Sequence, residues 1–125
     1  MQSVWTDSVN FPNFDKLKKN IRTDVLIIGG GMSGLSVAYQ MMNSDKKVVL
    51  IEKGKCGMGA TSKNTGKLTW MQDLIYSRLS NNYNSNVAKL YYDSQNEAID
   101  IVKDIIDKNN ISCHLKKTKS YVFSY

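Results

Sequence analysis

Residues 23–52 read TDVLIIGGGMSGLSVAYQMMNSDKKVVLIE, and this stretch decides the fold of the chain. Residues 25–28 form a short apolar run rich in β-branched side chains, which is typical of a parallel strand buried on both faces. Residues 32–42 carry apolar side chains along one helical face, and residues 48–51 repeat the strand pattern. The stretch therefore predicts a strand, a helix and a second strand parallel to the first.

Three glycines, Gly29, Gly31 and Gly34, form the pattern G-x-G-x-x-G between the first strand and the helix. The first allows a tight turn, the second lets the backbone approach a pyrophosphate, and the third lets helix and strand pack closely. A pyrophosphate is expected at the amino end of the helix, where unpaired N–H groups and the helix dipole favour an anion. Glu52 ends the second strand, where the acid that binds a ribose belongs. Its carboxylate would repel a 2′-phosphate, which disfavours NADP.

The segment that follows, residues 53–68, reads KGKCGMGATSKNTGKL and contains four glycines. This composition excludes an ordinary helix or strand and predicts a loop. Because the loop comes directly after Glu52, we expect its backbone to pass close to the cofactor. Gly59 and Ala60 allow close approach, and Thr61 and Ser62 offer hydroxyl groups. A mobile surface loop is the alternative.

Composition narrows the class of protein. A chain of 125 residues with 42% hydrophobic residues suits one globular domain. The net charge of +6 comes from lysines scattered in pairs, with no long basic run, so solvated surface lysines are favoured over a nucleic-acid site. No apolar run approaches the roughly 20 residues that span a membrane, and no signal peptide opens the chain. Cys56 and Cys113 are far apart in sequence, which indicates free thiols, no metal site and a cytoplasmic protein.

The flanking segments predict further elements. Residues 1–22 form an apolar lead-in arm, with a short helix expected near residues 15–19. Helices are expected over residues 70–82 and 86–109, and two short strands over residues 111–115 and 121–124. Five acids form one stripe of the second helix, and a solvated face is favoured over a metal site. Trp70 and Tyr76 are expected to pack in the core rather than to border a cofactor or substrate. His114 is expected to be an ordinary strand residue rather than a catalytic one.

A family resemblance rests on the sequence after the second strand. The chain continues IEK and then, over residues 59–66, GATSKNTG, which fits a G-A-[ST]-x-x-N-x-G segment. With the preceding Rossmann-like unit, this resembles the FAD-dependent oxidoreductases of the D-amino-acid oxidase superfamily, a group that includes glycine, sarcosine and glutamylputrescine oxidases. Residues 61–79, TSKNTGKLTWMQDLIYSRL, are most similar to members that carry an additional Rieske iron–sulfur domain. The resemblance covers nearly the whole chain but only about the amino-terminal third of such proteins, which implies a fragment.

The resemblance implies FAD as the cofactor, and Glu52 in place of aspartate leans toward FAD over NAD. Some relatives attach the flavin through a histidine at the position of Lys63, so the lysine implies non-covalent binding. The turn at residues 29–34 would contact the pyrophosphate, Glu52 the adenosine ribose, and residues 60–68 the pyrophosphate, ribityl chain and flavin. The cofactor-binding residues expected on these grounds are Gly29, Gly31, Met32, Ser33, Gly34, Glu52, Lys53, Gly59, Ala60, Thr61, Ser62, Gly66 and Leu68.

The fold class expected is α/β: a Rossmann-like FAD-binding βαβ unit with the start of a second, substrate-side β region. The domains expected are a lead-in arm at 1–22, the FAD-binding unit and flavin loop at 23–82, and a helix with strands at 83–125. The function implied by the resemblance is oxidation of an amine or amino-acid C–N bond by hydride transfer to the flavin. No catalytic residue is assigned. An NAD-dependent dehydrogenase and a non-catalytic nucleotide-binding fragment are the alternatives.

The partners expected are few. A small-molecule amine or amino acid is the substrate, and neither nucleic acid nor a membrane span is expected. The two strands after residue 109 have no evident partner in the sequence, so their edges would stay unpaired. Self-association of the isolated chain is therefore expected. The resemblance implies an enzyme, but the isolated chain is expected to be inactive.

Overall fold

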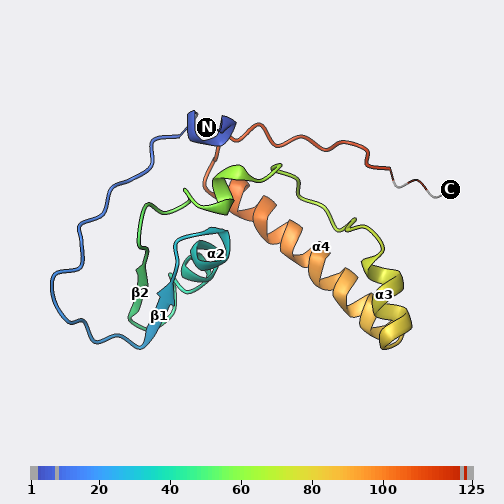
Figure 1. Ribbon diagram of the computed structural model, residues 1–125, viewed down its shortest axis with the longest axis horizontal. Coiled ribbons are helices and arrows are strands. Elements are labelled where there is room, and N and C mark those ends of the chain that lie inside the picture. Colours follow the sequence, from blue (N-terminus) through green and yellow to red (C-terminus); the bar gives the residue numbers. More distant parts are fainter. Residues whose placement is uncertain (1–2, 8, 122, 124–125) are drawn as a thin grey trace. The chain divides into compact units, whose positions relative to one another are not determined.

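The computed structural model describes residues 3–7, 9–121 and 123. The elements along the chain are α1 (Val4–Asp7), β1 (Val25–Ile28), α2 (Met32–Gln40), β2 (Val48–Ile51), the 3-10 turn η1 (Ala60–Lys63), α3 (Ile75–Asn82) and α4 (Ser85–Lys108) (Figure 1). The chain divides into two compact units, Met1–Thr65 and Gly66–Tyr125. The functional division at residues 23–82 stays a prediction.

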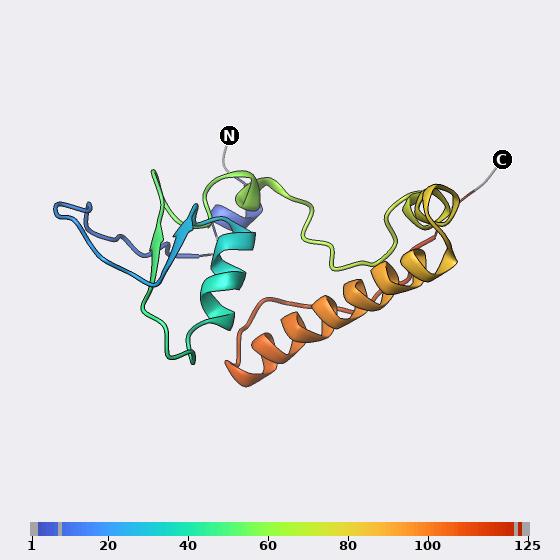
Figure 2. The same cartoon turned by 90° about the horizontal axis from the view of Figure 1, so that it is seen from below.

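The first unit is built on the βαβ arrangement that the sequence predicts. β1 and β2 pair in parallel, with Val25 opposite Val48 and Ile28 opposite Ile51. α2 connects the two strands and packs against both, which Figure 2 shows from below. Ile27 points toward this helix layer and is the one buried apolar side chain among the residues that the structure describes. The mixed α/β fold with a parallel pair is confirmed.

The other face of β1 is open in the described chain. Side chains alternate between the faces of a strand, so Leu26 and Ile28 lie opposite Ile27. Leu26 is 51% exposed and Ile28 is 79% exposed. Parallel sheets are normally covered on both faces. The described residues of the first unit therefore supply only one of the two layers of a doubly wound sheet.

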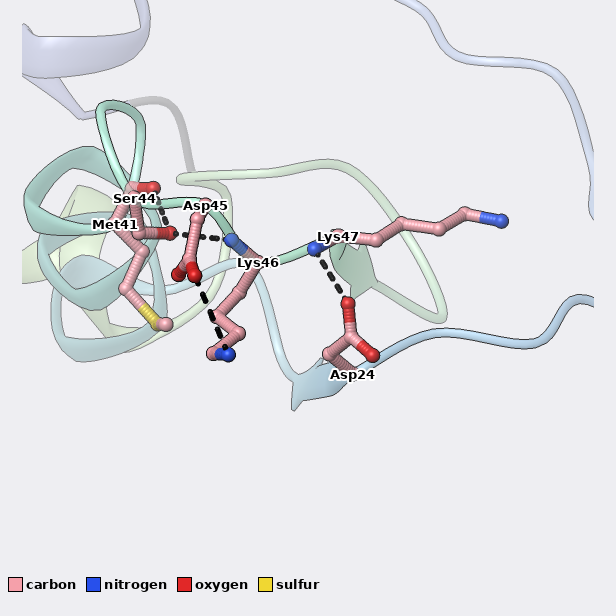
Figure 3. Close-up of polar contacts among 6 residues, drawn as sticks. All are labelled: Asp24, Met41, Ser44, Asp45, Lys46 and Lys47. Carbon is pink, nitrogen blue, oxygen red and sulfur yellow. Dashed lines mark hydrogen bonds and ion pairs between the residues drawn. The ribbon is translucent and has the colours of Figure 1, made fainter.

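The strands are brought into register at their amino ends by a polar turn (Figure 3). α2 ends in a turn in which Ser44 Oγ donates to the carbonyl oxygen of Met41 at 2.8 Å. Directly before β2, the Lys47 amide donates to Asp24 Oδ2 at 2.8 Å. The Asp24 amide in turn donates to the carbonyl of Lys47 at 3.1 Å. This reciprocal pair fixes the start of β1 beside the start of β2.

The lead-in arm differs from expectation. No helix forms over residues 15–19, all of which the structure describes. Three of these five residues are lysines, and a short helix without a buried face is not stable in water. The arm instead begins with α1, and Trp5 Nε1 donates to the carbonyl oxygen of Asn64 at 2.8 Å. Phe11 lies against Gly57, where an added Cβ would be 2.9 Å from Phe11 Cε1. The arm therefore supports the loop after β2.

The second unit is a pair of helices joined by aromatic packing. Asn84 caps α4, since its Oδ1 accepts from the Val87 amide at 3.0 Å. The rings of Trp70 and Tyr92 meet edge to face at 5.3 Å, and Tyr76 lies 6.0 Å from Tyr92. Tyr76 also donates its hydroxyl to the Trp70 carbonyl. Both side chains thus make packing contacts, but the core position predicted for Trp70 is wrong, because its side chain is 38% exposed.

The acidic stripe of α4 faces water. Its acids form ion pairs one helical turn away with exposed lysines, namely Lys89–Asp93, Lys103–Asp100 and Lys108–Asp104. The spacing follows from the helix repeat, which brings side chains three or four residues apart together. Within the described ranges, no helix is long and apolar enough to cross a membrane.

The strand predicted over residues 111–115 is wrong. These residues are described throughout and form neither a strand nor a helix. Asn110 and His114 adopt positive φ values of 51° and 53°, which interrupt an extended backbone. A short strand needs a neighbouring strand to pair with, and the local pattern cannot supply one. The strand predicted over residues 121–124 falls partly outside the described residues, which exclude 122 and 124.

Candidate nucleotide-binding site

A pocket of about 440 Å³ opens at the carboxyl ends of β1 and β2. Ligands of open parallel α/β sheets bind outside this end of the strands. Three segments meet there: the turn between β1 and α2, the turn directly after β2, and the beginning of η1. The lining residues are Ile28, Gly29, Gly30, Gly31, Met32, Ser33, Gly34, Glu52, Lys53, Lys55, Gly59, Ala60 and Thr61.

The turn between β1 and α2 requires glycine at two positions of the motif. Gly29 has a φ of 103°, and its amide donates to the carbonyl of Ile51 at 2.8 Å. A Cβ on Gly34 would lie 2.0 Å from the carbonyl oxygen of Gly29, so no side chain fits there. These contacts turn the chain sharply and set α2 closely on β1. Gly31 then caps α2, and its carbonyl accepts from the Leu35 amide at 2.9 Å.

Gly30, which the motif does not include, is also closely packed. Its amide donates to Glu52 Oε2 at 2.8 Å, and its carbonyl accepts from the Gly57 amide at 2.7 Å. A Cβ on Gly30 would lie 2.6 Å from Cys56 Sγ. The run of three glycines in the sequence could have drawn attention to this position. Its partners could not be found, because they follow β2 in an irregular segment.

The Glu52 carboxylate has both oxygens bound to backbone amides. Oε2 accepts from Gly30, and Oε1 accepts from the Gly54 amide at 2.8 Å. Hydrogen bonds from Gly30 and then Gly54 lower the pKa of Glu52 below its ordinary value of 4.5, and the Lys53 charge adds to this. Partial desolvation opposes the shift. The carboxylate is therefore ionised at neutral pH, and each oxygen keeps a lone pair that a ribose hydroxyl can use.

The loop that carries η1 closes onto the amino end of α2. Thr61 Oγ1 accepts from the Met32 amide at 2.9 Å, one of the donors that has no partner inside the helix. Ser62 is only 3% exposed, and its single hydroxyl proton is shared between the carbonyls of Met58 and Gly59, each 3.0 Å away. Thr61 thus borders the pocket, whereas Ser62 holds the loop together.

The sequence-based site and the pocket largely coincide. All of the predicted cofactor-binding residues line the pocket except Ser62, Gly66 and Leu68. Gly66 and Leu68 belong to the second compact unit, and their contact with a cofactor stays a prediction. Ile28, Gly30 and Lys55 line the pocket but were not predicted. Lys55 adds a second positive charge to that of Lys53 beside the glycine turn.

Comparisons with known proteins show similarity over most of the chain, including residues outside this pocket. The family model described as FAD dependent oxidoreductase matches residues 24–125. The Bacillus subtilis (strain 168) protein YhfW, provisionally described as a Rieske 2Fe-2S iron–sulfur protein, is 34% identical over 98% of this chain and 24% of its own length. Gamma-glutamylputrescine oxidoreductase of Escherichia coli (strain K12) is 29% identical over 89% of this chain and 26% of its own. Glycine oxidase of Bacillus licheniformis is 43% identical over 38% of this chain and 13% of its own.

The first two matches cover most of this chain but only part of each relative. The chain spans about a quarter of the length of the first two relatives. The similarity therefore concerns one portion of each relative, and it includes the βαβ unit and the pocket. No solved structure matches the chain significantly.

Proposed function

The chain belongs to the family of FAD-dependent oxidoreductases, and on that premise we propose that its first unit binds FAD for the oxidation of an amine or amino-acid C–N bond. Family membership confirms the resemblance seen in the sequence. The choice of substrate is supported by the names of two relatives, a gamma-glutamylputrescine oxidoreductase and a glycine oxidase. The observation that carries the FAD proposal is the Glu52 carboxylate held beside the glycine turn at the mouth of the pocket.

The donors of the pocket fit a dinucleotide. The amino end of α2 borders the glycine-lined pocket, and such helix ends bind phosphates. Lys53 and Lys55 bring two positive charges to the same pocket. Glu52 offers acceptor lone pairs for ribose hydroxyls. The residues present therefore match the chemistry of a pyrophosphate flanked by a ribose.

In the proposed activity, bound FAD supplies the hydride acceptor. The residues of this chain hold and orient the cofactor: Gly31, Ser33 and Gly34 through backbone N–H groups, Glu52 through its carboxylate, and Thr61 through its hydroxyl at the rim. Glu52 also disfavours a 2′-phosphate by charge repulsion. No described residue is assigned a proton-transfer role.

The FAD proposal is tested by titrating FAD into the chain and into Gly31→Val. A Cβ on Gly31 would lie 3.4 Å from Thr61 Oγ1, and the two further methyls of valine would occupy the pocket where the pyrophosphate is expected. We expect the variant to keep its helical circular dichroism and to lose FAD binding. Gln40→Val, which places the same side chain at the exposed end of α2, is the matched control. A folded Gly31→Val with normal flavin content would overturn the proposal.

The reaction is tested separately from binding. Titration with NAD in place of FAD tests for an NAD-dependent dehydrogenase. Binding of FAD is recognised by the visible absorbance of the oxidised flavin, which NAD lacks. Turnover of amines and amino acids with a dye acceptor then separates an enzyme from a nucleotide-binding protein. Because this chain spans about a quarter of its relatives' length, turnover is measured on a protein of the relatives' full length that contains these residues. Flavin binding by that protein without turnover of any C–N substrate would leave FAD in place and refute the substrate class.

A further inference from the structure

We propose that the turn after β2 is a clamp that fixes Gly30 and so forms the phosphate-binding turn before any ligand is bound. The clamp consists of residues 52–57. This inference rests on the proposed function, because it assumes that the glycine turn binds the diphosphate of FAD. It assigns Glu52 a second role, as a positioning residue that acts through Gly30, and it makes Gly30 a required position.

Three independent contacts join the clamp to Gly30. Glu52 Oε2 accepts the Gly30 amide at 2.8 Å. The Gly57 amide donates to the Gly30 carbonyl at 2.7 Å. Between these two bonds, Cys56 lies so close that an added Cβ on Gly30 would meet its Sγ at 2.6 Å and its Cα at 3.2 Å. Both polar groups of the Gly30 backbone are thereby paired, and its α-carbon is packed.

The clamp itself is held at both of its ends. At one end, the second oxygen of Glu52 accepts the Gly54 amide at 2.8 Å, which closes a tight turn. At the other end, Phe11 of the lead-in arm lies against Gly57. The clamp therefore links the arm, the loop after β2 and the glycine turn.

A clamp is needed because three consecutive glycines form the turn. Glycine loses more conformational freedom on ordering than any other residue. An unrestrained Gly29–Gly30–Gly31 segment would oppose ligand binding by that entropy, whereas a turn ordered in advance binds more tightly. Gly30 sits between the strand end and the cap of α2. Fixing it directs the neighbouring N–H groups toward the pocket.

The role of Glu52 can be separated from a ribose contact by exchange of amide protons without ligand. In the wild-type chain, we expect the Gly30 and Gly54 amides to be protected. In Glu52→Gln, one of the two carboxylate oxygens is replaced by an NH2 group. The position that this group takes can no longer accept a hydrogen bond from the Gly30 or the Gly54 amide. We expect at least one of these amides to exchange about tenfold faster in Glu52→Gln, since hydrogen bonds to charged groups are the stronger ones. Gly59→Ala, whose added Cβ meets no atom within 4 Å, is the control and leaves both amides unchanged.

The packing of Cys56 is tested by rescue. Gly30→Ala should lose Gly30 and Gly57 amide protection and weaken FAD binding by about tenfold or more, because the methyl displaces the clamp. Adding Cys56→Gly to Gly30→Ala removes the atom at 2.6 Å, and we expect the double variant to recover most of both losses. A methyl group that acted by blocking the ligand directly would not be rescued at Cys56.

The outcomes separate this inference from the proposed function. A Gly30 amide that exchanges freely in the wild-type chain would overturn the clamp, as would a double variant no better than Gly30→Ala. A wild-type chain with protected amides that Glu52→Gln releases, but with no affinity for FAD, would keep the clamp and refute the FAD proposal.

Discussion

The two units of this chain are stabilised by different kinds of contact. In Met1–Thr65, the hydrogen bonds that shape the pocket involve the backbone, either on both sides, as from Gly29 to Ile51, or on one side, as from Gly30 to the Glu52 carboxylate. In Gly66–Tyr125, side chains carry the packing, with the rings of Trp70, Tyr76, Tyr91 and Tyr92 gathered between the helices.

The difference predicts opposite sensitivities to mutation. Where a glycine packs closely, adding a single methyl group is disruptive, most of all at Gly34, because its nearest partner is a backbone carbonyl oxygen that cannot move aside. Where rings touch, removing a side chain is disruptive, whereas its exposed charged neighbours contribute little. The two tryptophans allow each unit to be followed alone, since Trp5 lies in the first and Trp70 in the second.

The largest effect is expected for Gly34→Ala. Alanine is the better helix former by about 1 kcal/mol, so helix propensity alone predicts a gain in stability. The 2.0 Å approach of its Cβ to the Gly29 carbonyl oxygen predicts instead a loss of about 3 kcal/mol or more. Urea unfolding followed by Trp5 fluorescence in a Trp70→Phe background measures it, with Gly59→Ala as the control. An unchanged unfolding midpoint would show that the backbone contact is not tight.

Tyr92→Ala tests the second unit in the same way. Tyr92 contacts the rings of both Trp70 and Tyr76 and is 38% exposed. Its removal should cost about 1–2 kcal/mol, less than a fully buried aromatic side chain. Trp70 fluorescence in a Trp5→Phe background reports the loss. Tyr83→Ala, at a tyrosine that is 69% exposed, is the control and should change the unfolding free energy by less than about 0.5 kcal/mol. Equal effects at the two tyrosines would contradict a ring-centred core.

The free energy of unfolding of the first unit should depend on pH through the ionisation of Glu52. Its pKa is lowered in the folded state, so it contributes stability above its ordinary pKa of 4.5. That contribution is lost as the pH falls from 4.5 through the lower, folded pKa. We expect the difference in unfolding free energy between the wild-type chain and Glu52→Gln to be constant from neutral pH to about 5.5 and to shrink below 4.5. A difference that is unchanged at pH 3 would mean that the charge of Glu52 is irrelevant to folding.

The smallest effect is expected on the water-facing side of α4. Asp104 pairs with Lys108 at 3.3 Å, but both side chains are largely exposed. Asp104→Asn should therefore change the unfolding free energy by no more than about 0.5 kcal/mol. Following Trp70 fluorescence at low and high salt checks this. A larger, salt-sensitive loss would show that the ion-pair ladder supports the helix.

The sequence predicted those parts of the structure whose signals are contiguous or periodic. The glycine motif and Glu52 occupy fixed places relative to two strands, so the pocket could be located from them. The amphipathic pattern likewise located α4 to within a residue or two of its ends. α3 begins later than expected, at Ile75, because Asp73 takes a positive φ of 48° that interrupts the helix.

The remaining features depend on contacts between distant residues. Gly30 against Cys56, and Phe11 against Gly57, join irregular segments that share no repeat. The strand predicted over residues 111–115 failed for the related reason that local propensity cannot provide a partner strand. Close contacts between irregular segments leave no pattern that a single sequence reveals.

The hydrogen bond from Trp5 to Asn64 has a consequence for the order of folding. It joins residues 59 positions apart, whereas β1 and β2 are joined through a single helix. Contacts that close longer loops form at a greater entropic cost and tend to form later. The βαβ core should therefore assemble first, and the lead-in arm should dock onto η1 afterwards. Although it precedes the βαβ core in the sequence, the arm would be the last part of this unit to reach its place.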